Sequence, residues 1–230
     1  MTSVKVEKLI KRFGENEVLK SVSINFEAGR IYGLVGRNGS GKSVLMKCIA
    51  GLVIPTSGSI DVFGKRIRKD VDFAPDTGIA IEQPGLLLKK SAFDNLRILS
   101  ALTKKPSTSE ISRLIELVGL NPKEQKAVGK YSMGMKQRLS IAMALLGDPK
   151  LLLLDEPMSN LDKAGADEMR ALFKKLAKEG KTILIATHVQ DDVSELCDGI
   201  CHLEAGEATF TSKTKDKATA LPRNTKAVHL

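Results

Sequence analysis

Three runs of consecutive apolar residues, with little alternation, stand out along this chain. They cover residues 31–35, 151–154 and 182–186. Runs of this length without a polar face are typical of strands covered on both sides, as in a parallel sheet. Apolar residues with helical spacing follow the first run at 44–50, and separate the other two at 163–178. This alternation of strands and helices predicts an α/β core with a mainly parallel sheet.

Other parts of the chain follow different periods. Three stretches alternate with period two and predict half-exposed strands of an antiparallel sheet at the edge of the core, 4–6, 22–26 and 59–62. Residues 79–81 form one more short apolar run. From about 86 to 147 the pattern is helical, with candidate helices at 91–102, 108–118 and 132–146. We therefore expect a helical subdomain inserted into the α/β core.

The chain has 230 residues, 42% hydrophobic and 27% charged, which fits one globular domain. We expect that domain to cover residues 1–210 and a basic, mobile tail to cover 211–230, where five basic residues face one acidic residue. The net charge of +9 would attract nucleic acid or an anionic membrane surface. Only 4% of residues are aromatic, and no basic run is interleaved with rings that stack bases. We therefore expect no nucleic-acid partner; solvated faces and a basic tail account for the charge, and contact of the tail with anionic lipid is the alternative.

The sequence also indicates the cellular compartment in which the protein is expected. No apolar run approaches the ~20 residues that span a bilayer, and the first residues lack the apolar core of a signal peptide. Cys48, Cys197 and Cys201 are scattered, and no second ligand pair with zinc spacing lies near them. We expect a protein that stays in the cytoplasm, with reduced cysteines that have a structural role.

A glycine-rich octapeptide between the first apolar run and the first helix carries the strongest chemical signal. It fits the phosphate-loop pattern G-x-x-x-x-G-K-[ST] and consists of Gly36, Arg37, Asn38, Gly39, Ser40, Gly41, Lys42 and Ser43. A strand, a glycine turn and a helix N-terminus direct backbone N–H groups and a helix dipole at one point, where a polyphosphate binds. We expect Lys42 to reach the outer phosphates and the Ser43 hydroxyl to ligate Mg²⁺.

Two more strand ends carry candidate catalytic residues. Asp155 and Glu156 follow the run of four leucines, at the sheet edge where α/β proteins bind ligands. We expect Asp155 to face the Mg²⁺ ion and Glu156 to polarise the water that attacks the γ-phosphate. His188 comes two residues after the run at 182–186 and would point its imidazole toward the same phosphate.

With these motifs the chain resembles the ATP-binding cassette (ABC) family, and the resemblance covers nearly all of residues 4–210. The Walker A loop is 36–43, the Walker B strand 151–157, the signature region 131–138, the D-loop 159–162 and the switch histidine His188. The resemblance implies that Ser132 and Gly134 contact ATP held by an opposite protomer, and that Asp162 belongs to the nucleotide site. It also implies that Phe13 stacks on adenine, although packing in the core is the alternative for this ring.

Two departures from the usual family pattern narrow the resemblance. The signature is Tyr-Ser-Met-Gly-Met instead of Leu-Ser-Gly-Gly-Gln, so the backbone at Met133 should avoid positive φ. Counting thirteen residues back from Asn95 places Glu82 at the Q-loop position as a further catalytic residue and Mg²⁺ ligand, with Gln83 as the competitor for that role. Both features resemble the cassettes of bacitracin- and lantibiotic-resistance exporters.

The resemblance implies an ATPase subunit of a membrane transporter, an exporter of antimicrobial peptides or similar compounds. It implies ATP and Mg²⁺ as cofactors, a separate transmembrane permease, and a cassette homodimer or heterodimer on the inner face of the membrane. Leu86, Leu87 and Leu88 are either a contact surface for the permease or buried core. The alternatives are a soluble cassette ATPase of DNA repair or translation, and a small-molecule phosphotransferase with the same loop.

Overall fold

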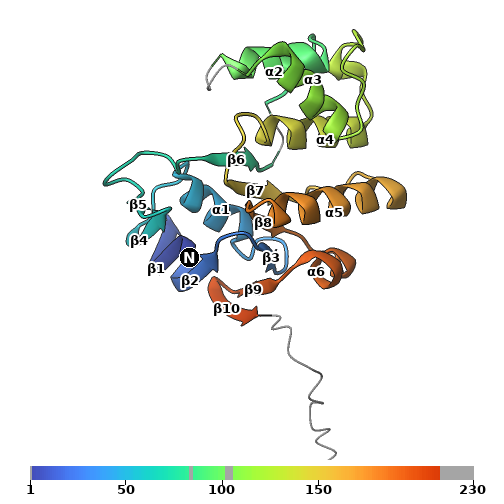
Figure 1. Ribbon diagram of the computed structural model, residues 1–230. Coiled ribbons are helices and arrows are strands. Elements are labelled where there is room, and N and C mark those ends of the chain that lie inside the picture. The colour runs from blue at the N-terminus through green and yellow to red at the C-terminus, as the bar shows by residue number, and fades with distance from the viewer. Residues whose placement is uncertain (1, 83–84, 102–105, 213–230) are drawn as a thin grey trace, which may run out of the picture.

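Two sheets and a separate group of helices make up residues 2–82, 85–101 and 106–212, which the computed structural model describes (Figure 1). The strands are β1 (Thr2–Phe13), β2 (Asn16–Glu27), β3 (Ile31–Val35), β4 (Ser57–Val62), β5 (Lys65–Arg66), β6 (Thr77–Ala80), β7 (Leu151–Asp155), β8 (Thr182–Ala186), β9 (Gly199–Glu204) and β10 (Glu207–Ser212). The helices are α1 (Lys42–Ala50), α2 (Ala92–Ser100), α3 (Thr108–Leu117), α4 (Met133–Ala144), α5 (Lys163–Lys178) and α6 (Gln190–Leu196), with a 3₁₀ turn η1 (Val128–Lys130).

The larger sheet has the strand order β10-β9-β3-β8-β7-β6. All of its neighbouring pairs are parallel except β9 and β10. In β7, Leu152 and Leu154 pack into the core that contains α4 and α5, while Leu151 and Leu153 pack into the core that contains α1. The strand therefore needs apolar residues on both faces, which is why it appears in the sequence as a continuous run. The predicted parallel sheet is confirmed.

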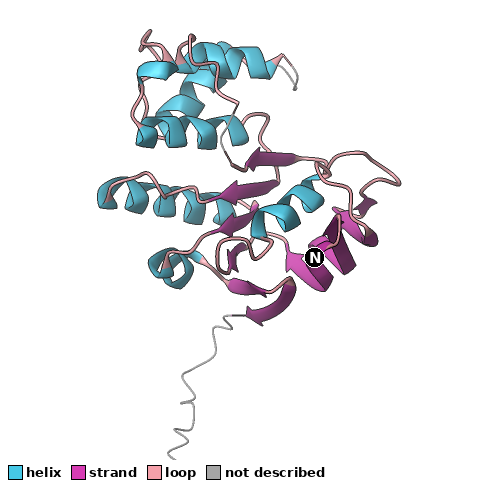
Figure 2. Ribbon diagram, turned by 180° about the vertical axis from the view of Figure 1, so that it is seen from behind, coloured by secondary structure: helices cyan, strands magenta, loops and turns pink. Residues whose placement is uncertain are grey.

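The smaller sheet is antiparallel, with the order β2-β1-β4-β5. Helix α1 packs between it and the larger sheet through fully buried residues such as Leu45 and Ile49 (Figure 2). The predicted edge sheet is thus present, but β1 and β2 are much longer than the alternating stretches that indicated them. Register shifts along the β1–β2 pair interrupt the period of two, so the sequence pattern revealed only part of each strand.

Helices α2, α3 and α4 form the expected helical group, standing apart above the larger sheet in Figure 1. Each begins directly after a serine whose hydroxyl accepts a hydrogen bond from the backbone N–H three residues later: Ser91, Ser107 and Ser132. This N-cap satisfies one of the free N–H groups of the first turn. The candidate helices at 91–102 and 132–146 are longer than α2 and α4, and residues 102–105 lie outside the described residues.

The C-terminal end of the described chain was not anticipated from the sequence. Helix α6 and the strands β9 and β10 follow His188, and β10 continues to Ser212, two residues past the boundary expected at 210. Phe210 contacts the ring of Tyr32, with ring centroids 5.9 Å apart, which ties this last strand to β3. Residues 213–230, nearly all of the expected basic tail, lie outside the described residues.

The three cysteines are buried. Burial raises the pKa of Cys48 to about 11 and that of Cys201 to about 12. Both thiols therefore stay protonated at neutral pH and serve as small apolar groups. Within the part of the chain that is described, no helix is both long and apolar enough to cross a bilayer.

Candidate nucleotide-binding site

The glycine-rich loop joins β3 to α1 in a conformation that excludes larger residues at two points. A Cβ on Gly36 would lie 2.2 Å from the Leu203 carbonyl oxygen, and Gly41 has φ 103°. Gly41 is also the N-cap of α1, so no side chain caps this helix end. The N–H groups and the dipole of the first turn are left available for an anion.

The Lys42 side chain hydrogen-bonds to the backbone of this loop. Its Nζ donates hydrogen bonds to the carbonyl oxygens of Gly36, at 2.8 Å, and Arg37, at 3.1 Å. The side chain is buried, and both of these partners are neutral carbonyls. A positive charge held among neutral acceptors attracts a polyphosphate strongly, because little water screens it.

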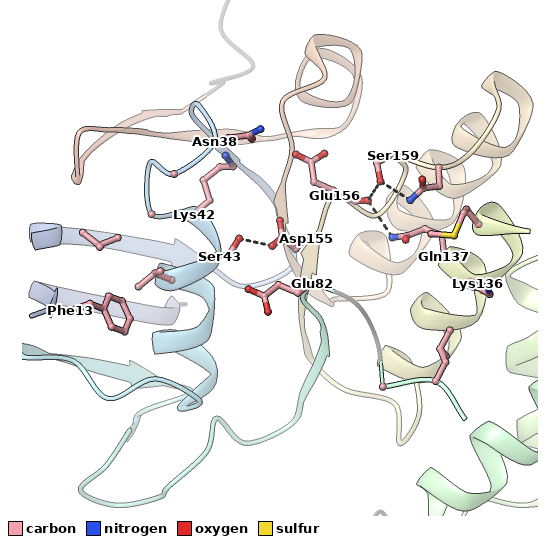
Figure 3. Close-up of a pocket in the computed structure, with 18 of the residues that line it drawn as sticks. Phe13, Asn38, Lys42, Ser43, Glu82, Lys136, Gln137, Asp155, Glu156 and Ser159 are labelled. Atoms are coloured by element: carbon pink, nitrogen blue, oxygen red, sulfur yellow. Dashed lines mark hydrogen bonds between the residues drawn. The ribbon is translucent and has the colours of Figure 1, made fainter. Parts of the chain in front are cut away.

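Asp155, the last residue of β7, meets the first turn of α1. Its Oδ2 accepts a hydrogen bond of 2.6 Å from Ser43 Oγ (Figure 3). The two residues are far apart in the sequence, and the sheet brings them together at the carboxyl ends of its parallel strands. A hydroxyl and a carboxylate side by side are hard oxygen donors of the kind that Mg²⁺ prefers.

Glu156 is fixed in an uncommon conformation beside His188. Its φ is 48°, in a region that non-glycine residues seldom adopt. Its N–H donates to the Ala186 carbonyl at 2.8 Å, and its own carbonyl accepts from Gln137 Nε2 at 3.2 Å and from Ser159 Oγ at 3.0 Å. Its carboxylate Oε1 lies 2.7 Å from His188 Nδ1. The sequence-predicted base and switch histidine are therefore direct neighbours.

Glu82 lies across the cavity from Glu156, near Ser43 and Asp155 in Figure 3. It also has a positive φ, 58°, and its Oε1 is 2.5 Å from Lys47 Nζ. Lys47 follows Ser43 by one helical turn, so it belongs to the same face of α1. Gln83, the competitor for the Q-loop role, lies outside the described residues.

Lys42, Ser43, Glu82, Asp155 and Glu156 line a cavity of about 1120 Å³ between the glycine loop, the ends of β6 and β7, and helix α4. Phe13 lies at its edge with 50% of the residue exposed, and Lys11 Nζ is 4.6 Å from the ring centroid. Core packing, the alternative for Phe13, does not fit so exposed a ring. An exposed aromatic face beside a phosphate cradle is suited to stacking on a purine.

Several predicted site residues do not line this cavity: Gly36, Arg37 and Ser40 of the glycine loop, the switch histidine His188, and Ser132, Gly134 and Asp162. Ser132 and Asp162 use their side chains as the N-caps of α4 and α5, accepting from Met135 N at 3.2 Å and Gly165 N at 2.9 Å. Gly134 packs against the Asn160 carbonyl, from which an added Cβ would be 2.9 Å away. Met133 is the first helical residue after Ser132 and, as expected, has no positive φ.

The structure gives roles to residues for which sequence reasoning predicted no individual role. Gln137 and Ser159 hold the Glu156 backbone, Asn160 lines the cavity, and Lys47 pairs with Glu82. For Lys47 a signal existed, because its spacing of four from Ser43 places both on one helix face. The other three depend on how α4 and the loop after β7 meet in space, which local sequence does not reveal.

Comparison with known proteins decides the family. A family model described as ABC transporter matches residues 19–159, more than half of the chain. The chain belongs to the ABC transporter family. As a member it is an ATP-binding, ATP-hydrolysing cassette.

Relatives within the ABC transporter family support this placement. The chain is 39% identical over 205 residues to the lantibiotic transport ATP-binding protein SrtF of Streptococcus pyogenes, covering 89% of this chain and 88% of that one. It is 38% identical over 203 residues to the bacitracin transport ATP-binding protein BcrA of Enterococcus faecalis, covering 86% of this chain and 66% of that one. The fold matches the ATP-binding cassette MJ0796, solved as a dimer bound to ADP and Pi, with a TM-score of 0.83 at 24% identity, covering 93% and 100% of the two chains.

Proposed function

We propose that this cassette hydrolyses ATP to drive a membrane exporter of antimicrobial peptides or similar compounds. The observation that carries the proposal is one cavity lined by Lys42 of the glycine loop, the Ser43–Asp155 pair and Glu156, whose carboxylate contacts His188. The exporter assignment is supported by the named transport functions of BcrA and SrtF.

One copy of the chain supplies the groups that bind the phosphates and the base. Backbone N–H groups of residues 36–43 and the Lys42 ammonium hold the phosphates, and Phe13 stacks on the base. Ser43, Asp155 and Glu82 are oxygen donors placed to hold Mg²⁺, which would neutralise part of the phosphate charge when bound.

Hydrolysis requires a water directed at the γ-phosphorus and an acceptor for its proton. The Glu156 carboxylate accepts the proton as the new P–O bond forms and the bond to the bridging oxygen of ADP breaks. His188, in contact with Glu156 Oε1, orients the carboxylate and faces the γ-phosphate. The products are ADP and inorganic phosphate.

We propose that Ser132, Gly134 and Asp162 complete the site of a second copy. Ser132 is exposed at the N-terminus of α4 and does not line the cavity of its own chain. The N-terminus of a twelve-residue helix with a serine cap can bind an anion. ATP would then bridge two protomers, as a homodimer or a heterodimer, and hydrolysis would remove the bridge.

The proposed partner in the membrane is a separate permease, with the cassette bound to its cytoplasmic side. Leu87 and Leu88 are 44% and 54% exposed. For these two residues the exposure favours a contact surface over buried core, whereas Leu86 packs against the core of the helical group. The tail lysines of residues 213–226 remain a candidate for contact with anionic lipid.

Phosphate release from purified protein tests the proposal. With Mg²⁺ and ATP alone, a cassette ATPase releases phosphate, whereas a phosphotransferase needs an added acceptor. Co-expression with a permease encoded beside it should yield a complex that purifies together. Phosphate release only with an acceptor, or no complex with any membrane protein, would contradict the assignment.

The Lys47–Glu82 pair predicts an effect on magnesium dependence. Lys47→Met frees the Glu82 carboxylate, so half-saturation of ATPase activity should need about two- to five-fold less Mg²⁺, in line with the ~0.5–1 kcal/mol of an exposed ion pair. Lys47→Arg is the matched control and should leave the dependence unchanged. An equal shift from Lys47→Met in a Glu82→Gln background would show that Glu82 is not involved.

A further inference from the structure

A buried ion pair joins α5 to α6 behind the nucleotide site. Arg170 donates to Asp192 Oδ1 from Nε at 3.0 Å and from Nη2 at 2.6 Å. The two residues are only 9% and 2% exposed. A buried pair of charges persists only where its geometry and its remaining hydrogen bonds are good.

The second oxygen of Asp192 continues this contact toward the catalytic residues. Asp192 Oδ2 accepts a hydrogen bond of 3.1 Å from Thr187 Oγ1. Thr187 is 1% exposed and stands directly before His188. Its Oγ1 accepts in turn from Val189 N at 3.1 Å, so the hydroxyl holds the backbone on both sides of His188.

His188 itself has little other support. Its side chain is 65% exposed, and its Nδ1 lies within hydrogen-bond distance of Glu156 Oε1. Val189, the N-cap of α6, makes no side-chain capping bond. Because the ring is so exposed, the backbone of His188 largely sets its orientation. Thr187 fixes that backbone, and its N–H also donates to the Leu34 carbonyl at 3.2 Å.

The charges around this network keep it intact at neutral pH. Arg170 Nη1 also donates to Asp167 Oδ1 at 2.6 Å, and Glu195 contributes a further negative charge. Burial lowers the pKa of Arg170, but hydrogen bonding and attraction to Asp192, with help from Asp167, raise it more. The guanidinium therefore stays charged and keeps donating to Asp192.

We infer that Arg170, Asp192 and Thr187 position His188 against Glu156 and so set the rate of ATP hydrolysis. The three residues do not line the nucleotide cavity, so they are positioning residues. The inference rests on the proposed ATPase function. A small displacement of a catalytic group lowers the rate of the chemical step much more than it lowers substrate binding.

Thr187→Val tests this link with minimal change of shape. We expect kcat to fall about ten-fold while KM for ATP changes less than two-fold, and Thr187→Ser to restore most of kcat. Asp192→Asn is the second variant and should act in the same direction. The matched control is Thr182→Val at the opposite end of β8, where an equally buried hydroxyl bonds Ser3 Oγ at 2.8 Å and Gly29 N at 3.2 Å.

Thr182→Val should lower the thermal midpoint but leave kcat unchanged. Equal loss of kcat in both threonine variants, or none in Thr187→Val, would overturn the inference. An NMR readout that does not depend on hydrolysis separates it from the proposed function. The chain has three histidines, and Thr187→Val should shift the ring resonances of His188 alone. A wild-type protein without ATPase activity would refute the proposed function, whereas an unchanged His188 signal would refute the positioning role.

Discussion

Glu156→Gln should lower kcat for ATP hydrolysis by about 10²- to 10³-fold while ATP still binds. Glutamine keeps the size of the side chain and the backbone contacts of Glu156 to Gln137, Ser159 and Ala186. It removes the carboxylate that accepts the proton, and general-base catalysis contributes typically ~10²–10⁴-fold. Phosphate release and the binding of a fluorescent ATP analogue measure the two effects separately.

A matched control for this change is Glu179→Gln at the C-cap of α5, outside the cavity. It should leave both kcat and ATP affinity unchanged. Undiminished hydrolysis by Glu156→Gln would remove Glu156 from its role as base. A loss of ATP binding together with hydrolysis would instead show that the carboxylate supports the nucleotide site itself.

Lys42→Met should raise the Kd for ATP by about 10- to 100-fold. Methionine retains most of the length of the side chain, but it loses the ammonium that now bonds the Gly36 and Arg37 carbonyls. A hydrogen bond to a charged group contributes ~1.5–3 kcal/mol, and that difference corresponds to the expected change in affinity. Titration calorimetry with ATP measures the change directly.

Lys65→Met, on the exposed strand β5, is the control for Lys42→Met and should bind ATP as the wild type does. The thermal midpoint of Lys42→Met without nucleotide reports whether the loop still folds. Normal ATP affinity in a folded Lys42→Met protein would mean that the glycine loop binds phosphate without the lysine.

The sequence predicted those parts of the fold whose residues are apolar in an uninterrupted pattern. The strands β3 and β8 have the predicted bounds. Both faces of each strand are buried, so their apolar residues follow one another without alternation. Strand β9 was not predicted because Gly199, His202 and Glu204 interrupt its apolar positions. Helix α6 was not predicted because it is short and has acidic residues in its first turn.

The candidate site was predictable where residues act within one local motif. The glycine loop is such a case, since backbone geometry and the helix N-terminus are set by adjacent residues. The partner of Glu82 and the supports of Glu156 come from distant segments, so only the folded chain reveals them. Asp162 stays a prediction, because resemblance assigned it to the nucleotide site and its carboxylate caps α5 within this chain.

A mixing experiment tests the central proposal, that one ATP is held by the glycine loop of one copy and by Ser132 of another. At an ATP concentration near the wild-type Kd, Lys42→Met and Ser132→Arg should each be nearly inactive alone. Random pairing gives mixed dimers with one intact site, so mixing should restore about a quarter of wild-type ATPase activity. Mixing Lys42→Met with Glu156→Gln is the control and should restore none, because both changes lie in the same half of the site. No recovery in the Lys42→Met and Ser132→Arg mixture would contradict the shared site.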